Sequence, residues 1–165
     1  MNTNSKLTTG QIVGLGAAVL VLLLFFFPWV ELNLLFASTN LSGFQLATGT
    51  GPGGSKFPGL PSLLLIPLSM LGATALLGFC FLNSAASLRR LVAPLLIAAG
   101  GISAVIIIYQ YLTVNQQLNQ DVVGMITQQM FTYSFGAHGS LLGSAAVAAG
   151  GVIDLMTAPK PTPIA

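Results

Sequence analysis

The sequence predicts an all-α membrane protein: a single domain, residues 1–165, built as a four-transmembrane-helix bundle with a small extracytoplasmic cap. Only 5% of its residues are charged, whereas a soluble domain carries about 25%, so the chain has too few charges to cover a water-facing surface. The mean hydropathy of +0.87 also favours lipid as the solvent. Four stretches are apolar over roughly the 20 residues that a bilayer core requires: residues 10–29, 62–82, 91–112 and 136–156.

The first predicted helix, residues 10–29, ends in the sequence Pro28-Trp29. Lys6 precedes it, as a basic residue precedes the core of a signal peptide, but this core is long for a signal peptide and no small-x-small cleavage pattern follows Trp29. We therefore expect a retained first helix. Tryptophan is enriched at membrane–water interfaces, so Trp29 is predicted to be the interfacial anchor at which the chain leaves the bilayer.

The other three stretches are also expected to be helices, because backbone polar groups in lipid must be paired internally. Pro67 and Pro94 lie within a turn or two of the expected helix starts. A proline costs little there, since the first-turn N–H groups have no partner inside the helix.

The basic residues predict the orientation of the bundle. Lysine and arginine accumulate in short cytoplasmic loops, and four of the five basic residues fall on one side of the predicted spans. Both termini are therefore expected in the cytoplasm, with outer loops at residues 30–61 and 113–135. The four are Lys6, Arg89, Arg90 and Lys160, and the fifth, Lys56, lies in the first outer loop.

The first outer loop begins with a partial alternation of apolar and polar residues, which predicts a strand. Ser42-Gly43 is typical of a turn, and Phe44–Leu46 is predicted to be either a second short strand or a dip back to the membrane surface. The Gly- and Pro-rich residues 48–61 are expected to form a loop without regular structure. The two sides of the predicted strand are Leu32, Leu34 and Phe36, and Glu31, Asn33 and Leu35.

The second outer loop carries apolar residues at helical spacing among glutamines and asparagines. This stripe predicts either that the third helix continues beyond the lipid or that a separate amphipathic helix lies on the surface. The stripe could pack on the protein's own first loop or dock another subunit, and both interpretations stay open. Its members are Val114, Leu118, Val122, Met125 and Ile126.

Ionisable residues within a membrane are functional candidates by default, but few are present. His138 and Asp154 fall near opposite ends of the fourth stretch, and Glu31 follows the first. Imidazole could ligate haem iron or a chlorophyll magnesium, so His138 is the one cofactor-binding candidate. Since the chain has no second histidine, we expect instead a histidine that is hydrogen-bonded at a helix end, with no cofactor and no metal. Asp154 is expected to pair with a basic residue of its own side: Arg89, Arg90 or Lys160.

No catalytic pattern is present in the sequence. It lacks a Ser-His-Asp set, paired carboxylates and an HExxH motif, so the protein is not expected to be an enzyme. The lone Cys80 cannot build a disulfide or a cysteine-based metal site within the chain. The net charge of +2, with no basic cluster beyond Arg89-Arg90, argues against nucleic-acid binding.

The fourth stretch carries small residues at a spacing that lets membrane helices approach closely. One set repeats every four residues, and a GxxxG pair lies beside it. These residues predict a helix-packing face, and packing inside the four-helix bundle is expected to account for part of it. The face comprises Gly136, Gly139, Ser140, Gly143 and Ser144.

The layout of the chain resembles the four-helix plan of claudin-like proteins, with a long first outer loop after a tryptophan and a shorter second one. The claudin loop signature includes a cysteine pair, and this chain has no cysteine in its expected outer loops. Pro28-Trp29-Val30 and Ser42–Gly49 are also similar to small bacterial four-helix membrane proteins with a PWV exit from the first helix and an SGFQLATG-type segment. This resemblance implies a bacterial cytoplasmic membrane and no assigned activity.

The expected function is that of a non-catalytic accessory or structural subunit of a larger membrane complex, with respiratory and photosynthetic electron-transport assemblies as the leading examples. The expected partners are other integral membrane subunits and the lipid bilayer, not nucleic acid. Two alternatives stay open: a small transporter or channel, which requires a polar path through the spans, and a claudin-like scaffold that self-associates through its outer loops.

Overall fold

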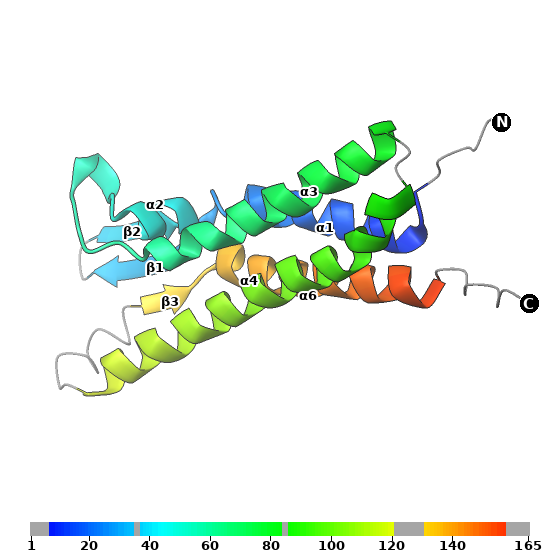
Figure 1. Cartoon of the computed structure of the whole chain (residues 1–165). Coiled ribbons are helices and arrows are strands. Elements are labelled where there is room, and N and C mark those ends of the chain that lie inside the picture. Colours follow the sequence, from blue (N-terminus) through cyan, green and yellow to red (C-terminus); the bar gives the residue numbers. More distant parts are fainter. Residues whose placement is uncertain (1–6, 35–36, 84–85, 121–130, 158–165) are drawn as a thin grey trace, which may run out of the picture.

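Four long helices run along one common axis, and a small sheet lies at one end of them (Figure 1). The computed structural model describes residues 7–34, 37–83, 86–120 and 131–157. Within these residues, the end that carries the sheet is called the sheet end; α1 begins and α6 finishes at the opposite end. The long helices are α1 (Thr9–Leu24), α3 (Leu65–Asn83), α4 (Ala86–Gln120) and α6 (Phe135–Thr157).

The four helices form a ring in which each has two neighbours. Helix α6 packs against α1 and α4, and α3 packs against the same two helices from the other side. Successive helices run in opposite directions along the axis (Figure 1). Their shared core is apolar and contains side chains that are almost fully buried, including Val21, Met70, Leu96 and Val147.

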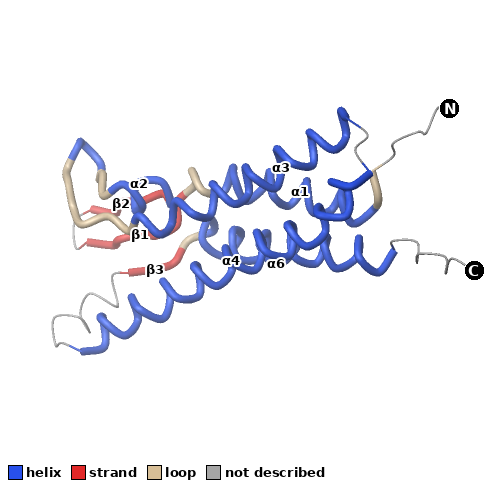
Figure 2. Tube along the Cα trace, viewed as in Figure 1, coloured by secondary structure: helices blue, strands red, loops and turns tan. Residues whose placement is uncertain are grey.

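The sheet contains three short antiparallel strands in the order β2-β1-β3, drawn in red in Figure 2. Strand β1 lies in the middle, so that Glu31 is opposite Asn40 on one side and opposite Thr132 on the other. The sheet therefore joins the segment after α1 to the segment before α6. The strands are β1 (Pro28–Leu34), β2 (Ala37–Ser42) and β3 (Phe131–Tyr133).

A short helix, α2 (Gly43–Thr48), follows β2 directly. The sequence predicted a strand or a membrane dip at Phe44–Leu46, and the structure corrects this. The Ser42 hydroxyl accepts from the Gln45 N–H and the Gln45 side chain accepts from the Ser42 N–H, at 3.2 and 2.9 Å. This reciprocal capping box starts a helix, and Gly49 ends it with a φ of 70°.

The Gly- and Pro-rich residues 48–61 are more ordered than the sequence predicted. They contain the 3-10 turn η1 (Pro52–Gly54), and a second, η2 (Pro61–Leu64), leads into α3. The segment folds back on α2, because the Phe57 N–H donates to the Gly49 carbonyl at 2.9 Å and the Leu60 N–H donates to the Leu46 carbonyl at 2.8 Å.

Three of the described helical segments are long and apolar enough to cross a membrane: Pro61–Cys80, Leu91–Gln116 and Phe135–Thr157. The expected stretches 62–82, 91–112 and 136–156 correspond to these three. Helix α1 is apolar but has only 16 residues, so the expected helix over residues 10–29 is corrected to Thr9–Leu24. Pro28 has no N–H with which to continue a helix, and it is the first residue of β1.

Candidate interaction surfaces

The small residues of α6 lie against other elements of the same chain. A Cβ atom added to Gly136 would lie 2.5 Å from the Pro28 carbonyl oxygen, and one added to Gly143 would lie 2.5 Å from a Val21 methyl carbon. Gly139 likewise faces Leu24. At Gly136 the nearest atom belongs to the backbone, so a side chain there would push α6 and β1 apart and glycine is required for this contact.

The two serines of the same face are completely buried. On the α4 side, a Cβ atom on Gly100 would lie 2.5 Å from the Ser144 carbonyl oxygen. The Ser144 hydroxyl donates to the Ser140 carbonyl at 2.8 Å. The predicted helix-packing face is therefore filled by α1, β1 and α4, and a partner chain would have to use another surface.

Asp154 joins the two helices that meet at the end opposite the sheet. Its carboxylate accepts from the Thr8 hydroxyl at 2.5 Å and from the Gln11 side-chain amide at 3.2 Å, and only 7% of the residue is exposed. Thr8 and Gln11 also form the capping box that begins α1. The negative charge therefore lies at the N-terminus of α1, where the helix dipole favours an anion.

From the sequence, Asp154 was expected to form an ion pair with a basic residue rather than hydrogen bonds with Thr8 and Gln11. The described contacts of the carboxylate are those with Thr8 and Gln11. The side chains of the expected partners lie outside the described part of the structure: Arg89, Arg90 and Lys160.

Trp29 is packed inside the protein at the sheet end. Its indole N–H donates to the Leu24 carbonyl at 3.0 Å, and this bond replaces the helical one that the backbone of Pro28 cannot make. The ring stands edge-on to Phe25, with ring centroids 5.8 Å apart. Since Trp29 is only 4% exposed, its ring contacts protein. A role of this position as the boundary of a membrane span stays a prediction.

His138 lies in the first turn of α6 with an exposed side chain. Its Nδ1 is 3.1 Å from the Ser134 carbonyl oxygen, and its ring meets the ring of Tyr111 edge-on, with centroids 6.0 Å apart. Within the described residues, no three His, Cys, Asp or Glu side chains come together at a possible metal site.

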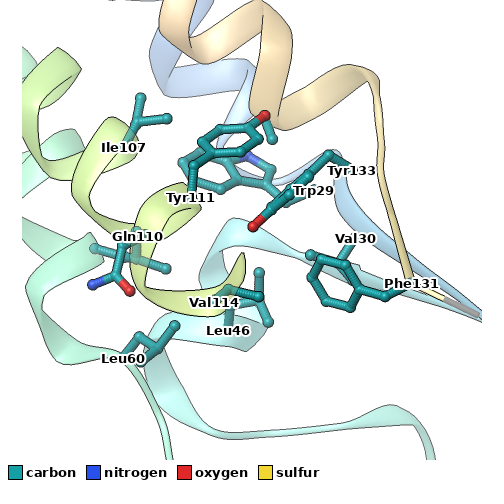
Figure 3. Close-up of a pocket in the computed structure, with 12 residues that line it drawn as sticks. Trp29, Val30, Leu46, Leu60, Ile107, Gln110, Tyr111, Val114, Phe131 and Tyr133 are labelled. Atoms are coloured by element: carbon teal, nitrogen blue, oxygen red, sulfur yellow. The ribbon is translucent and has the colours of Figure 1, made fainter. Parts of the chain in front are cut away.

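A cavity of about 90 Å³ lies between the sheet and α4. Its walls are almost entirely apolar and come from β1, α2, η2, α4, β3 and the first turn of α6. Figure 3 shows the side chains that surround it. Residues that line it include Trp29, Leu46, Leu63, Ile107, Val114 and Tyr133.

Two tyrosines in the cavity wall bury their hydroxyl groups. The rings of Tyr111 and Tyr133 contact each other, with centroids 3.9 Å apart. Neither hydroxyl has a hydrogen-bond partner among the described residues. Burial, together with the neighbouring Tyr111, raises the pKa of Tyr133 to about 12, so this phenol keeps its proton, and stays a hydrogen-bond donor, well into the alkaline range.

No pattern in the sequence predicts a role for these two tyrosines. Tyr111 lies at the end of an apolar stretch, and Tyr133 lies twenty-two positions later, near the end of the second expected outer loop, residues 113–135. Their meeting depends on the pairing of β3 with β1. The signal in the sequence was that Tyr111 lies just before that loop and Tyr133 lies near its end.

A second hollow is a groove of about 200 Å³ between α3 and α4. Its lining is apolar, and most of it consists of small residues. A Cβ atom added to Gly72 would meet no atom within 4 Å, so this part of α3 is open to whatever surrounds the bundle. The lining residues are Ser69, Gly72, Ala73, Leu95, Ala98, Ala99 and Ile102.

These features define the class of the protein: it is mostly helical, with three helices long and apolar enough to cross a membrane. Comparisons with protein families, with curated proteins and with solved structures find no match to the chain.

Proposed function

We propose that the protein is a non-catalytic accessory subunit of a larger membrane assembly, inserted through four helices with both termini in the cytoplasm. In this proposal the sheet end is the outer end of the bundle, as the basic residues of the sequence predict. A bacterial cytoplasmic membrane and an electron-transport assembly, respiratory or photosynthetic, are the proposed setting, the former on the resemblance of its PWV and SGFQLATG segments.

The observation that carries this proposal is the groove between α3 and α4. Membrane helices associate where small residues let their backbones approach. The small residues of α6 are already used within the chain, whereas two small residues of the groove, Gly72 and Ala98, are exposed. A helix of another subunit that carries a few larger side chains would fit against this surface.

The short length of α1 also favours association of the protein with other membrane helices. Its 16 residues extend about 24 Å at 1.5 Å per residue, less than the roughly 30 Å of a hydrocarbon core. A short span is accommodated by a thinner bilayer or by association with other helices. The exposed apolar side chains of α1 and the turn after it, such as Leu23 and Phe26, suit either lipid or a neighbouring subunit.

Self-association in the manner of claudin-like scaffolds is the second candidate function. It is favoured by β2, which lies at the edge of the sheet and pairs only with β1 among the described residues. An edge strand offers unpaired backbone groups to a second sheet. This route uses the sheet end, whereas the accessory-subunit proposal uses the side of the bundle, so one experiment can separate them.

That experiment is purification of the tagged chain from native membranes in mild detergent, followed by identification of the chains recovered with it. We expect other integral membrane proteins to be recovered, and Gly72→Leu to reduce their recovery by filling the groove. Gly78→Leu is the matched control, because Gly78 also lies on α3, does not line the groove, and has no atom within 4 Å of an added Cβ. Recovery of the chain alone as a monomer would refute both candidates, and recovery only of further copies of itself would favour the scaffold.

A further inference from the structure

We infer that the cavity between the sheet and α4 binds the ester-linked end of an acyl chain from a membrane lipid. This inference rests on the membrane insertion that we propose, but not on the accessory-subunit role. It concerns the 90 Å³ cavity beside Trp29 and Tyr133, a different place from the groove between α3 and α4.

The size and lining of the cavity suit a short hydrocarbon segment. A dry protein cavity of about 150 Å³ is large enough to hold benzene, so a volume of about 90 Å³ holds a few methylene groups. Its walls include Leu46, Leu63, Ile107 and Val114, with almost no polar surface. Gln110, the one amide among the described lining residues, already donates to the Ser62 hydroxyl at 2.9 Å. A charged or strongly hydrated ligand would lose its water here without replacement.

Two hydroxyl groups of the described wall have no partner, those of Tyr111 and Tyr133, and the ligand is assigned to the hydroxyl of Tyr133. Figure 3 shows Tyr133 reaching from β3 toward α4, with its hydroxyl oxygen in the space between Tyr111 and Val114. The hydroxyl has no partner among the described residues, and leaving a buried donor unpaired is costly. An ester carbonyl is an uncharged acceptor, so it would satisfy this donor at the polar end of an apolar chain.

The height of the cavity along the bundle matches the place of ester groups in a bilayer. Leu63 lies at the start of the apolar segment Pro61–Cys80, and Ala137 lies in the first turn of Phe135–Thr157. Tyr111 lies in the last turns of Leu91–Gln116. All three apolar segments thus end at the level of the cavity. In an inserted protein this is the boundary between the hydrocarbon core and the headgroup layer, where the acyl esters lie.

Trp29 provides a direct test, because it is the only tryptophan of the chain and lines the cavity. It is 4% exposed, so lipid outside the bundle does not reach its ring. The full chain would be reconstituted in phosphatidylcholine vesicles whose acyl chains carry bromine, a contact quencher, either near the ester end or near the methyl end. We expect Trp29 fluorescence to be quenched strongly by bromine near the ester and weakly by bromine near the methyl end.

Two variants separate occupancy of the cavity from nearby lipid. Val114→Phe fills the cavity and is expected to abolish the ester-end quenching. Val105→Phe makes the same change on the same helix at a residue that is 66% exposed, and it should leave quenching unchanged. Tyr133→Phe preserves the ring but removes the donor, and should raise the fraction of brominated lipid needed for half-maximal quenching by about 5-fold.

Flotation of the chain with the vesicles measures membrane insertion separately. A wild-type chain that does not float would refute the proposed membrane insertion. A chain that floats but shows no ester-end quenching would refute only the lipid site, and would indicate that water or protein alone surrounds Trp29. Quenching that is unchanged in a folded Val114→Phe variant would also refute the site. If that variant loses its helical circular dichroism, the Tyr133→Phe titration decides, and an unchanged half-maximal fraction refutes the site.

Discussion

Gly10 and Gly150 bring the backbones of α1 and α6 into direct contact. A Cβ atom on Gly10 would lie 2.5 Å from the Gly150 carbonyl oxygen, and a Cβ atom on Gly150 would lie 2.7 Å from the Gly10 carbonyl oxygen. Neither helix can therefore accept even a methyl group without moving away from the other. The contact lies beside Asp154, whose own backbone is within 3.0 Å of a Cβ on Gly10, so the glycines also set the distance over which Thr8 and Gln11 reach the carboxylate.

Gly150→Ala is expected to destabilise the protein by about 1–3 kcal/mol, because overpacking at a backbone contact forces α1 and α6 apart. Gly16→Ala is the control. Gly16 lies in α1, one of the two helices in contact, but a Cβ atom there meets nothing within 4 Å. Because alanine favours a helix more than glycine does, Gly16→Ala should not destabilise the protein. Unfolding of the purified protein, followed by circular dichroism in a denaturing detergent titration, measures both. Equal losses of stability would contradict a specific contact.

Asp154, Gln11 and Thr8 are expected to behave as one coupled group. Gln11→Leu removes one donor from a buried carboxylate, and Asp154→Leu removes the acceptor from two donors. Each change should cost about 1–3 kcal/mol. The double variant should cost less than the sum of the two, with a coupling of roughly 0.5–3 kcal/mol in a double-mutant cycle. Strictly additive effects would indicate that the 3.2 Å contact between Gln11 and Asp154 does not contribute to stability.

Apolar stretch length was enough to predict three of the long helices, because a run of about 20 apolar residues has few other stable forms. The end of α1 was harder to place. Phe25, Phe26 and Phe27 extend the apolar run, and hydropathy does not distinguish a helix from the turn that they form. Pro28 was the local signal for the end. The indole bond from Trp29 to Leu24 that supports it depends on a side-chain orientation that the sequence does not reveal.

The cavity could not be predicted, since its walls come from segments far apart in the chain. The pairing of Val30 with Tyr133 brings β3 to β1 over about a hundred residues of chain.

The start of α2, in contrast, has a local signal in the sequence. Ser42 and Gln45 match the S-x-x-Q pattern of a capping box, as Thr8 and Gln11 match T-x-x-Q at the start of α1. The alternation of apolar and polar residues before Ser42 is a competing strand signal, and Phe44–Leu46 was therefore predicted to be a second short strand or a dip to the membrane surface.

The start of α2 should be sensitive to its cap. Ser42→Ala removes the acceptor for the Gln45 N–H, and it should cost about 1 kcal/mol. Ser42→Asp retains an acceptor and should cost much less. Because α2 contributes Leu46 to the cavity wall, native-state hydrogen exchange of residues 43–48 is the appropriate measurement. Equal exchange rates in the wild type and Ser42→Ala would show that tertiary packing alone maintains this helix.

Ser140→Ala is expected to leave stability unchanged or to raise it by about 1 kcal/mol. The Ser140 hydroxyl is fully buried and has no hydrogen-bond partner among the described residues, and removal of an unsatisfied buried group removes its desolvation cost. Ser144→Ala is the comparison, because that hydroxyl donates to a carbonyl and its loss should not stabilise. The same denaturing titration measures both variants. A clear destabilisation by Ser140→Ala would indicate that this hydroxyl has a partner after all.

Tyr133 should make the stability of the protein depend on pH in the alkaline range. Its pKa is raised from an ordinary value of 10.0 to about 12, so the folded state holds the phenolic proton more tightly than the unfolded state. Unfolding then releases this proton at pH values between the two pKa values, and a rise in pH favours unfolding. The contribution of Tyr133 should be constant below pH 10 and should decline from there through about pH 12.

Tyr133→Phe should remove that part of the decline, whereas Tyr109→Phe, at a residue that is 62% exposed, should retain it. Denaturing titrations of the three proteins across this range, with the ultraviolet absorbance of tyrosinate as a second readout, measure the effect, and identical alkaline profiles for the wild type and Tyr133→Phe would contradict a buried, protonated phenol at the sheet end.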